Sequence, residues 1–227
     1  YENLQIQNNL IHGSYLAKVK NLIFLGSSCI YPKFCKQPMK ENYLLDGKLE
    51  ETNDAYAIAK IAGITMCHNY SKYYKLNYKS LMPPNLYGPG DNYDLKTSHF
   101  FPALLKKILT AKNKKKKILV IWGSGKPRRE LMFVDDFAEA LIYFMNKKIK
   151  EPFINIGNGK DSTIDWYAKF IMKRLNTKLK IIYDKSKSDG MPRKCLDISL
   201  AKKYGWKPKK NLDYGFDLTL RDFLKNR

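Results

Sequence analysis

The stretch Asn21-Leu-Ile-Phe-Leu-Gly-Ser-Ser28 decides the fold class, because it is a short continuous apolar run that ends in small polar residues. An apolar run without alternation is typical of a parallel strand that is buried on both faces. In open α/β sheets, the loop at the carboxyl end of such a strand carries ligand-binding groups. The sequence therefore predicts a buried strand followed by a functional loop that begins at Ser27.

Outward from this stretch, helical and strand patterns alternate along the chain. Apolar residues at helical spacing predict helices over 4–19, 54–75, 99–111, 135–145, 162–174 and 213–225. Short apolar runs predict further strands over 80–87, 118–122, 153–157 and 180–183. The alternation predicts an α/β fold, namely a Rossmann-like doubly wound parallel sheet with a smaller α/β substrate-binding lobe.

The beginning of a doubly wound domain is not recognisable in the sequence. Such a domain normally opens with a strand, a glycine-rich turn and a helix, but residues 1–20 contain no glycine-rich turn. We expect the chain to be a fragment truncated at its amino terminus, with about 80 residues in front. An upstream partner chain and a cofactor-free descendant are the two alternatives.

The composition excludes several classes of protein. A hydrophobic content of 44% argues against disorder, and no apolar run reaches the length of about 18 residues that crosses a bilayer. The four cysteines form no C-x-x-C pair, and with three histidines no metal site is expected. The sequence predicts a cytoplasmic protein without a membrane segment.

The net charge of +21 by itself suggests an anionic partner. However, it comes from 36 Lys and only 6 Arg, spread along the chain, whereas nucleic-acid readers use arginine forks gathered on one face. The densest run, Lys114 to Lys117, lies between a predicted helix and a predicted strand and is typical of a solvated loop. We expect no nucleic-acid partner and a phosphate-rich small ligand instead.

The first candidate for chemistry is Tyr56-x-x-x-Lys60, in the predicted helix 54–75. Residues four apart share a helix face, so the ammonium is expected near the phenol, where it would lower the pKa of Tyr56. The motif alone arises readily by chance among 16 Tyr and 36 Lys. Its context is more specific, because Gly26-Ser-Ser-Cys-Ile-Tyr-Pro32 precedes it by about one crossover.

Taken together, several stretches resemble the GDP-L-fucose synthase family of extended short-chain dehydrogenase/reductases. The resemblance spans nearly the whole chain and rests on five stretches: Leu25-Gly-Ser-Ser-Cys-Ile-Tyr-Pro-Lys33, Lys36-Gln-Pro-Met39, Ala55-Tyr-Ala-Ile-Ala-Lys-Ile-Ala-Gly63, Asn85-Leu-Tyr-Gly-Pro89 with Ser98-His99, and Ser188-Asp-Gly-Met-Pro-Arg-Lys194. The family's glycine-rich fingerprint has no counterpart. A further departure is Pro84, where a small hydroxyl residue is commoner, and proline lacks an amide donor.

The resemblance implies NADPH-dependent 3,5-epimerisation and 4-reduction of GDP-4-keto-6-deoxy-D-mannose to GDP-L-fucose, in a homodimer. The residues that match catalytic positions would be Tyr56, Lys60, Ser27, Cys29 and His99. Cys29 and His99 would exchange protons at C3 and C5, because thiols and imidazoles titrate near neutrality in suitable surroundings. Ser27 and Tyr56 would bind the C4 oxygen.

The resemblance also implies two binding sets and a division into domains. The NADP site would include Lys60, His99, Ser27, Ser28, Pro83, Pro84, Asn85 and Leu86. The GDP-sugar site would include Lys107, Trp122, Arg129, Asp189 and Lys194. We expect residues 1–92 and 133–160 to form the remaining part of the NADP-binding domain, and residues 93–132 and 161–227 to form the substrate-binding lobe.

Two other functions stay open. The chain could be another nucleotide-sugar epimerase or dehydratase of the same superfamily, although a simple 4-epimerase needs no acid/base couple such as Cys29 and His99. It could also be a non-catalytic fragment that binds sugar nucleotides or polyanions and lacks the cofactor half, as the net charge would allow.

Overall fold

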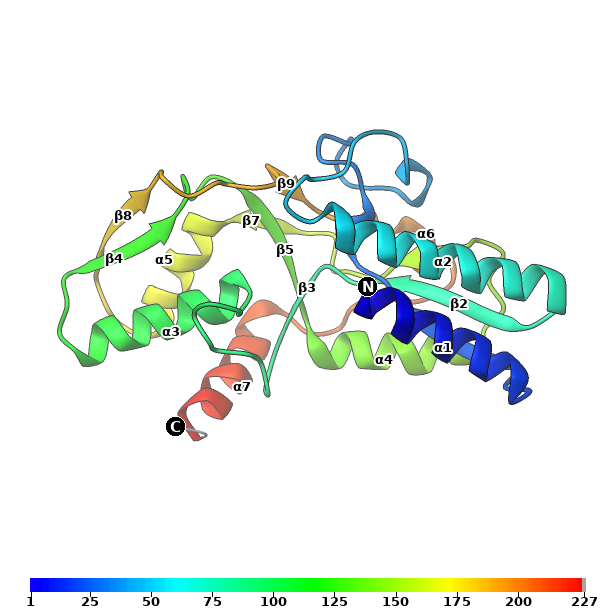
Figure 1. Cartoon of the computed structure of the whole chain (residues 1–227). Helices are drawn as coiled ribbons and strands as arrows, with labels where there is room; N and C mark the ends of the chain where they lie inside the picture. Colours follow the sequence, from blue (N-terminus) through cyan, green and yellow to red (C-terminus); the bar gives the residue numbers. More distant parts are fainter. Residues whose placement is uncertain (226–227) are drawn as a thin grey trace.

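A parallel three-stranded sheet forms the centre of one half of the molecule. The computed structural model describes residues 1–225, and in it the strands β1 (Asn21–Leu25), β2 (Asn77–Met82) and β6 (Phe153–Asn155) pair in the order β1-β2-β6. Leu25 lies opposite Leu81, and Met82 lies opposite Asn155. The carboxyl ends of the three strands therefore meet at one edge, and the predicted α/β class with its parallel sheet is confirmed (Figure 1).

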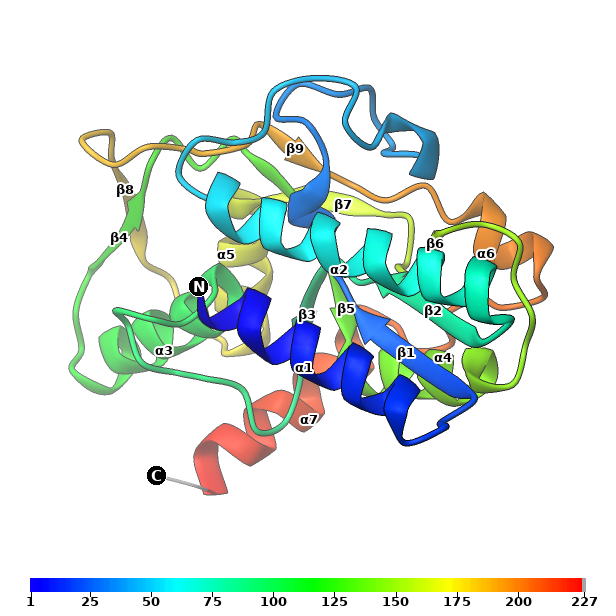
Figure 2. The ribbon, with the colours of Figure 1, turned by 45° about the vertical axis from the view of Figure 1, so that its right-hand side comes forward.

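Alternate residues of these strands serve two cores on opposite faces of the sheet. Phe24, Tyr78 and Phe153 pack with α1 (Glu2–Leu16) and α2 (Asp54–Tyr74). Leu81 and Ile154 pack instead with α4 (Val134–Met145) and α6 (Ser199–Lys203). Successive side chains of a strand point to opposite faces, so both faces of the sheet are covered. The prediction that the whole run at β1 is buried is wrong, because β1 lies at the edge of the sheet: Phe24 is buried, whereas Leu25 is 44% exposed. Figure 2 shows α1 and α2 lying side by side over one face.

The second half of the molecule has its own core. Strands β4 (Ile118–Trp122) and β8 (Lys180–Asp184) pair in parallel. Helices α3 (Phe100–Asn113), α5 (Ile164–Arg174) and α7 (Leu212–Lys225) contribute most of the remaining core residues. This lobe lies to the left in Figure 1, whereas α6, also within the predicted segment 161–227, lies against the first half.

Between the halves runs β5 (Arg128–Phe133), which the sequence patterns did not predict as a strand. It pairs in parallel with β3 (Asn85–Tyr87) and β9 (Arg193–Lys194), and antiparallel with β7 (Asp161–Thr163). Its buried residues belong to different cores, Leu131 to the lobe and Met132 to the sheet. The strand therefore links the two halves.

The predicted strand 80–87 is wrong as a single element. The chain forms β2 up to Met82 and resumes as β3 at Asn85, in a different sheet. The break falls at Pro83 and Pro84, which have no backbone N–H to donate to a ladder. The predicted helices and the strands at 118–122, 153–157 and 180–183 have counterparts whose bounds differ by a few residues.

Two short 3₁₀ turns complete the described elements, η1 (Ser28–Ile30) after β1 and η2 (Glu41–Tyr43) in the segment before α2. Within residues 1–225, no helix is both long and apolar enough to cross a membrane.

The Asp161 side chain links β7 to β5 and β9 through ion pairs with two arginines. Its side chain is 4% exposed and bonds Arg128 Nε at 2.8 Å and Arg193 Nε at 2.7 Å. Burial alone would raise the pKa of Asp161, but hydrogen bonds and charge from the two guanidinium groups outweigh burial and lower the pKa. Because the folded pKa lies below the unfolded one, the contribution to stability is present at neutral pH and is lost as pH falls through the folded pKa.

We therefore expect Asp161→Asn to lower the free energy of unfolding at pH 7 by about 1–2 kcal/mol, since the arginines are partly exposed and solvent weakens the pairs. Below about pH 4, the unfolded pKa of aspartate, the difference from wild type should shrink. Urea unfolding at a series of pH values measures both effects. Asp46→Asn, at an exposed site, is the control. A pH-independent difference would contradict the assignment.

Candidate active site

Ser27, Cys29 and Tyr56 lie together at the carboxyl end of β1. The chain leaves the strand at Leu25, and Ser27 caps the turn η1 by accepting a hydrogen bond from Cys29 N–H at 3.2 Å. Tyr56 comes from the first turn of α2. Ser27 hydrogen bonds to both Cys29 and Tyr56, and the charge of Cys29 acts on Tyr56. A hydroxyl and a thiol predicted from one motif and a phenol predicted from another therefore share one site.

The pKa of the Cys29 thiol is lowered by its neighbours at this site. Burial opposes ionisation, but the charge of Lys194, together with hydrogen bonds from Ser27, Lys194 and Asn53, lowers the pKa of Cys29 below its usual value. Lys194 Nζ lies 3.0 Å from Cys29 Sγ. A thiol with a lowered pKa can remove a proton from carbon at neutral pH. The other cysteines differ, because burial raises the pKa of Cys35 and raises those of Cys67 and Cys195 to about 12.

The expected lowering of the Tyr56 pKa by Lys60 is wrong for this structure. Burial and the neighbouring Cys29 charge raise the pKa of Tyr56, with hydrogen bonding from Ser27 acting in the opposite direction. Lys60 Nζ donates to the carbonyl of Leu25 at 2.9 Å and lies 5.7 Å from the centre of the Tyr56 ring. The ammonium therefore faces the sheet edge, and Tyr56 is suited to donate a proton at neutral pH.

The predicted cofactor segments lie at the same edge of the sheet. Ser28 N–H donates to Pro83 O at 3.0 Å, so the loop after β1 and the Pro83–Pro84 break after β2 are joined. Asn85 and Leu86 begin β3, and Asn85 Nδ2 donates to Glu130 O at 3.3 Å. These residues follow neighbouring parallel strands, which is where open α/β sheets bind ligands.

Four of the predicted substrate residues line one pocket of about 280 Å³ in the second lobe: Lys107, Trp122, Arg129 and Asp189. Lys107 Nζ lies 4.8 Å from the centre of the Trp122 ring, and Lys187 Nζ lies 5.7 Å from it. The Trp122 side chain is 58% exposed. The pocket wall thus combines a flat ring with the Lys107 ammonium, and Lys187 lies against the same ring, which suits an anionic ligand that carries a ring.

Arg129 connects this pocket to the Cys29 site. Its guanidinium donates to Met191 O at 2.6 Å and to Asp189 O at 3.4 Å. Burial lowers the pKa of Arg129, while the charges of Cys29 and Asp189 act in the opposite direction. Asp189 is held by Ser124, whose backbone N–H and hydroxyl both donate to its carboxylate at 2.7 Å. Asp189 therefore orders the Gly123–Gly125 turn at the pocket wall.

His99 and Lys194 lie differently from the rest of the predicted set. His99 precedes α3 with an exposed side chain, between the pocket residues Ser98 and Phe100, and its charge acts on Asp91. In the described part of the chain, no hydrogen bond or ion pair joins His99 to Cys29 or Tyr56. Lys194 lies against Cys29 and is not among the residues of the 280 Å³ pocket.

Sequence reasoning missed three residues of this region. Asn53 precedes α2 and hydrogen bonds to Cys29. Glu130 is fully buried, and burial raises its pKa to about 7, although it accepts backbone N–H groups. Ser98 Oγ is buried at the pocket and has no hydrogen-bond partner among residues 1–225. Asn directly before a helix is a recognisable signal, whereas the others depend on contacts between distant segments.

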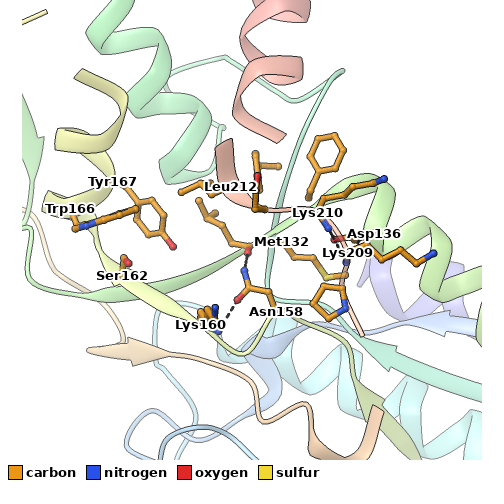
Figure 3. Close-up of a pocket in the computed structure, with 15 residues that line it drawn as sticks. Met132, Asp136, Asn158, Lys160, Ser162, Trp166, Tyr167, Lys209, Lys210 and Leu212 are labelled. Atoms are coloured by element: carbon orange, nitrogen blue, oxygen red, sulfur yellow. Dashed lines mark hydrogen bonds between the residues drawn. The ribbon is translucent and has the colours of Figure 1, made fainter. Parts of the chain in front are cut away.

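A larger cavity, of about 400 Å³, lies elsewhere, between β5, α5 and the start of α7, and Figure 3 shows the residues that line it. Its polar groups are largely paired within the protein. Asn158 Oδ1 accepts from Lys160 N–H at 2.7 Å, and Asp136 accepts from the backbone N–H groups of Lys209 and Lys210. None of the sequence-predicted site residues lines it. We therefore assign chemistry to the Cys29 site.

Within residues 1–225, no group of three or more His, Cys, Asp or Glu side chains is arranged to hold a metal ion.

The chain is similar in sequence and in structure to several enzymes that act on GDP-sugars. The chain is 44% identical to the GDP-L-fucose synthase of Escherichia coli (strain K12), covering 100% of this chain and 74% of the relative. A crystal structure of a GDP-6-OMe-4-keto-L-xylo-heptose reductase from C. jejuni superposes with a TM-score of 0.92 at 33% identity, covering 100% of this chain and 76% of the other. A GDP-L-fucose synthetase from Naegleria fowleri bound to NADP gives a TM-score of 0.89 at 27% identity, covering 99% and 72%.

The sequence model of the NAD dependent epimerase/dehydratase family matches residues 1–157, which include every member of the Ser27–Cys29–Tyr56 site. The resemblance inferred from the motifs is thereby confirmed. The chain belongs to the NAD dependent epimerase/dehydratase family, in the extended short-chain dehydrogenase/reductase group that contains the GDP-L-fucose synthases.

Proposed function

We propose that the chain catalyses 3,5-epimerisation and NADPH-dependent 4-reduction of GDP-4-keto-6-deoxy-D-mannose, giving GDP-L-fucose. The observation that carries this proposal is the contact between Ser27, Cys29 and Tyr56, in which a thiol of lowered pKa lies beside two hydroxyl groups. The 44% identity to a named GDP-L-fucose synthase over the whole chain supports the same reaction.

The two steps can share one site because both depend on one ketone. A carbonyl at C4 acidifies the hydrogens on C3 and C5, since removal of either proton gives an enolate whose charge lies on the C4 oxygen. In the reduction, the same oxygen develops negative charge as an alkoxide. Donors fixed around one oxygen therefore stabilise every transition state of the sequence.

Ser27 and Tyr56 are the proposed donors to the C4 oxygen. The Ser27 hydroxyl is fixed by the turn η1, and the Tyr56 phenol remains protonated at neutral pH because burial and the Cys29 charge raise its pKa. A protonated phenol can stabilise an enolate and then give its proton to the alkoxide. Cys29 is the proposed base, and His99 the proposed partner acid, brought to the substrate from the start of α3.

The residues at the sheet edge fit an NADP cofactor. Lys60 Nζ uses one of its three donors on Leu25 O, so donors remain for ribose hydroxyls at the carboxyl end of β1. The loop Ser27–Ser28 and the segment Pro83–Leu86 are joined there by a backbone hydrogen bond, and they would border the nicotinamide. When bound, NADPH supplies the hydride for C4. Lys60 would orient the ribose, and Tyr56 would supply the proton to oxygen.

The pocket of Lys107, Trp122, Arg129 and Asp189 is the proposed site for the GDP portion of the substrate. The Arg129 guanidinium and the Lys107 ammonium suit a pyrophosphate, and the exposed Trp122 ring supplies an apolar wall for the nucleoside. The charge contact between Arg129 and Cys29 joins the nucleotide and sugar ends of the site. On this proposal, residues 1–92 and 133–160 form the cofactor domain, and 93–132 and 161–227 form the substrate-binding lobe, apart from α6, which packs against the sheet of the cofactor domain.

A second candidate is a reductase that acts on a related GDP-4-keto sugar without epimerising it. The superposition on the GDP-6-OMe-4-keto-L-xylo-heptose reductase, with a TM-score of 0.92, favours it. The difference between the two functions lies in whether solvent hydrogen enters the sugar carbons next to the ketone.

We expect Tyr56→Phe to lower the rate of NADPH consumption by about two orders of magnitude or more, because the developing alkoxide loses its proton donor. Exchange of C3 and C5 hydrogens with D2O should remain measurable, since Cys29 is intact. Both rates can be followed by absorbance and NMR. Tyr73→Phe, an exposed residue later on α2, is the control. Equal loss of both steps would contradict the division of roles.

Cys29→Ser should reduce solvent exchange at C3 and C5 by about two orders of magnitude or more, because an alcohol with a much higher pKa replaces the base. Deuterium incorporation, measured with excess GDP-4-keto-6-deoxy-D-mannose, gives the rate directly. Cys35→Ser should leave it unchanged, since that thiol has a raised pKa and lies outside the site. Undiminished exchange in Cys29→Ser would remove Cys29 from proton transfer.

We also propose that the chain acts as a cytoplasmic homodimer. What supports dimerisation is the apolar surface of α1, where Leu4, Ile6 and Leu10 are exposed, 60% and 62% for the last two. Ile58 on α2, the helix that packs on α1, is also exposed. The four free cysteines are compatible with the reducing cytoplasm.

Leu10→Glu should therefore shift the protein from dimer to monomer in light scattering after size-exclusion chromatography, because a charge would be buried in the interface. Ile142→Glu, at a 78% exposed position of α4, should leave the dimer intact. A wild-type monomer, or equal behaviour of the two variants, would contradict the proposed interface.

A further inference from the structure

We propose that Lys194 and Asn53 form, with Ser27, a fixed cradle that keeps Cys29 as a thiolate before substrate binds, so that Lys194 acts as a positioning residue for the base. This inference rests on the proposed function in one respect, namely that the thiolate serves as the base in the epimerisation. The sequence resemblance assigned Lys194 to substrate binding, and it gave Asn53 no role.

The contact between Lys194 and Cys29 is direct. The ammonium nitrogen lies 3.0 Å from the sulfur, although the residues are 165 positions apart in the chain. Both side chains are half-buried, so solvent screens the pair less than it would at the surface. A nearby cation favours the charged form of an acid, and Cys29 has the lowered pKa that this contact requires.

The backbone holds Lys194 in place on both sides. Lys194 lies in β9, opposite Arg129 of β5. The next residue, Cys195, receives a hydrogen bond from Met39 N–H at 2.7 Å and donates to Gln37 Oε1 at 3.0 Å. The ammonium therefore extends from a fixed point.

Glu130, which is fully buried, also holds the segment of Lys194 in place. Its buried carboxylate accepts N–H from Leu196 at 2.7 Å and from Gly159 at 2.7 Å. It thereby ties the segment that carries Lys194 to the loop after β6. Two strands, β5 and β9, and two loops are joined around the Lys194 backbone, and its side chain reaches Cys29.

Asn53 acts on Cys29 in the same direction as Lys194. It occupies the N-cap position of α2, where an asparagine side chain normally accepts a hydrogen bond from the first turn of the helix. No such cap bond is formed. The side chain instead hydrogen bonds to Cys29. Helix α2 therefore lacks the stabilising hydrogen bond of a capping side chain, and the Asn53 amide interacts with the Cys29 sulfur instead.

The other charged groups around the sulfur are consistent with an anion there. Arg129 on β5 is a second cation whose pKa responds to Cys29, and Tyr56 on α2 is a neutral phenol with a raised pKa. Burial opposes the thiolate, and Glu50, whose charge acts on Lys194 and Arg129, is a nearby acidic group. In the reaction, the thiolate takes a proton from the carbon next to the ketone and becomes a thiol. The electron pair of the C–H bond becomes the C=C bond of the enolate, and the π pair of the carbonyl moves to the ketone oxygen.

The test is the pH dependence of Cys29 alkylation by iodoacetamide, measured on the full chain without substrate or cofactor and located by peptide mass spectrometry. We expect Lys194→Met to raise the apparent pKa of alkylation by about one unit or more, and Asn53→Ala to raise it by less. Lys194→Arg should largely restore it. Lys185→Met, an exposed lysine of the preceding segment, is the control, and thermal unfolding checks that each variant is folded.

An alkylation profile of folded Lys194→Met that matches wild type would overturn the proposal. This outcome is distinct from failure of the proposed function, which concerns exchange at C3 and C5. If Lys194→Met shifts the alkylation pKa but Cys29→Ser leaves the exchange intact, the cradle stands and Cys29 is not the base. If the alkylation profile is unmoved while Cys29→Ser abolishes exchange, Cys29 is the base and Lys194 does not tune it.

Discussion

The parallel pairing of β1 with β2 is the constraint on which the rest of the structure depends. Its register sets Leu25 opposite Leu81, and backbone hydrogen bonds continue past both strands, from Gly26 to Leu81 and from Ser28 to Pro83. The loop that bears Ser27 and Cys29 is therefore fixed against the segment that begins β3. Because α2 packs on this sheet and starts at the same edge, Tyr56 in the first turn of α2 lies beside that loop.

Individually held positive charges complete the site. The chain carries a net charge of +21, but the cations with a chemical part are few and individually held. Lys194 is anchored beside Cys29, Arg129 is held by the carbonyls of Met191 and Asp189, and Lys60 is held by Leu25 O. An anionic substrate and a thiolate can share this space because each has its own fixed cation.

The sequence predicted the elements with strong patterns and failed where tertiary contacts decide. The strand β1 and the helix with Tyr56 were predictable because an apolar run and apolar residues at helical spacing are local signals, although β1 is less buried than its sequence suggested. β5 was missed, since Arg128, Arg129 and Glu130 are polar and each is satisfied by a distant segment. The motifs brought Ser27, Cys29 and Tyr56 together correctly. They could not predict that Lys60 faces a carbonyl or that Lys194 reaches Cys29, because spacing along the chain does not give distances between segments.

The most direct test of the account is the position of hydrogen in the product. The full chain would be incubated in D2O with GDP-4-keto-6-deoxy-D-mannose and NADPH, and the sugar product analysed by NMR. The account predicts deuterium at C3 and C5, inverted at both centres, with the hydride from NADPH at C4. A product that carries the hydride at C4 and no deuterium at C3 or C5 would contradict it, because the ketone would then have no base beside it.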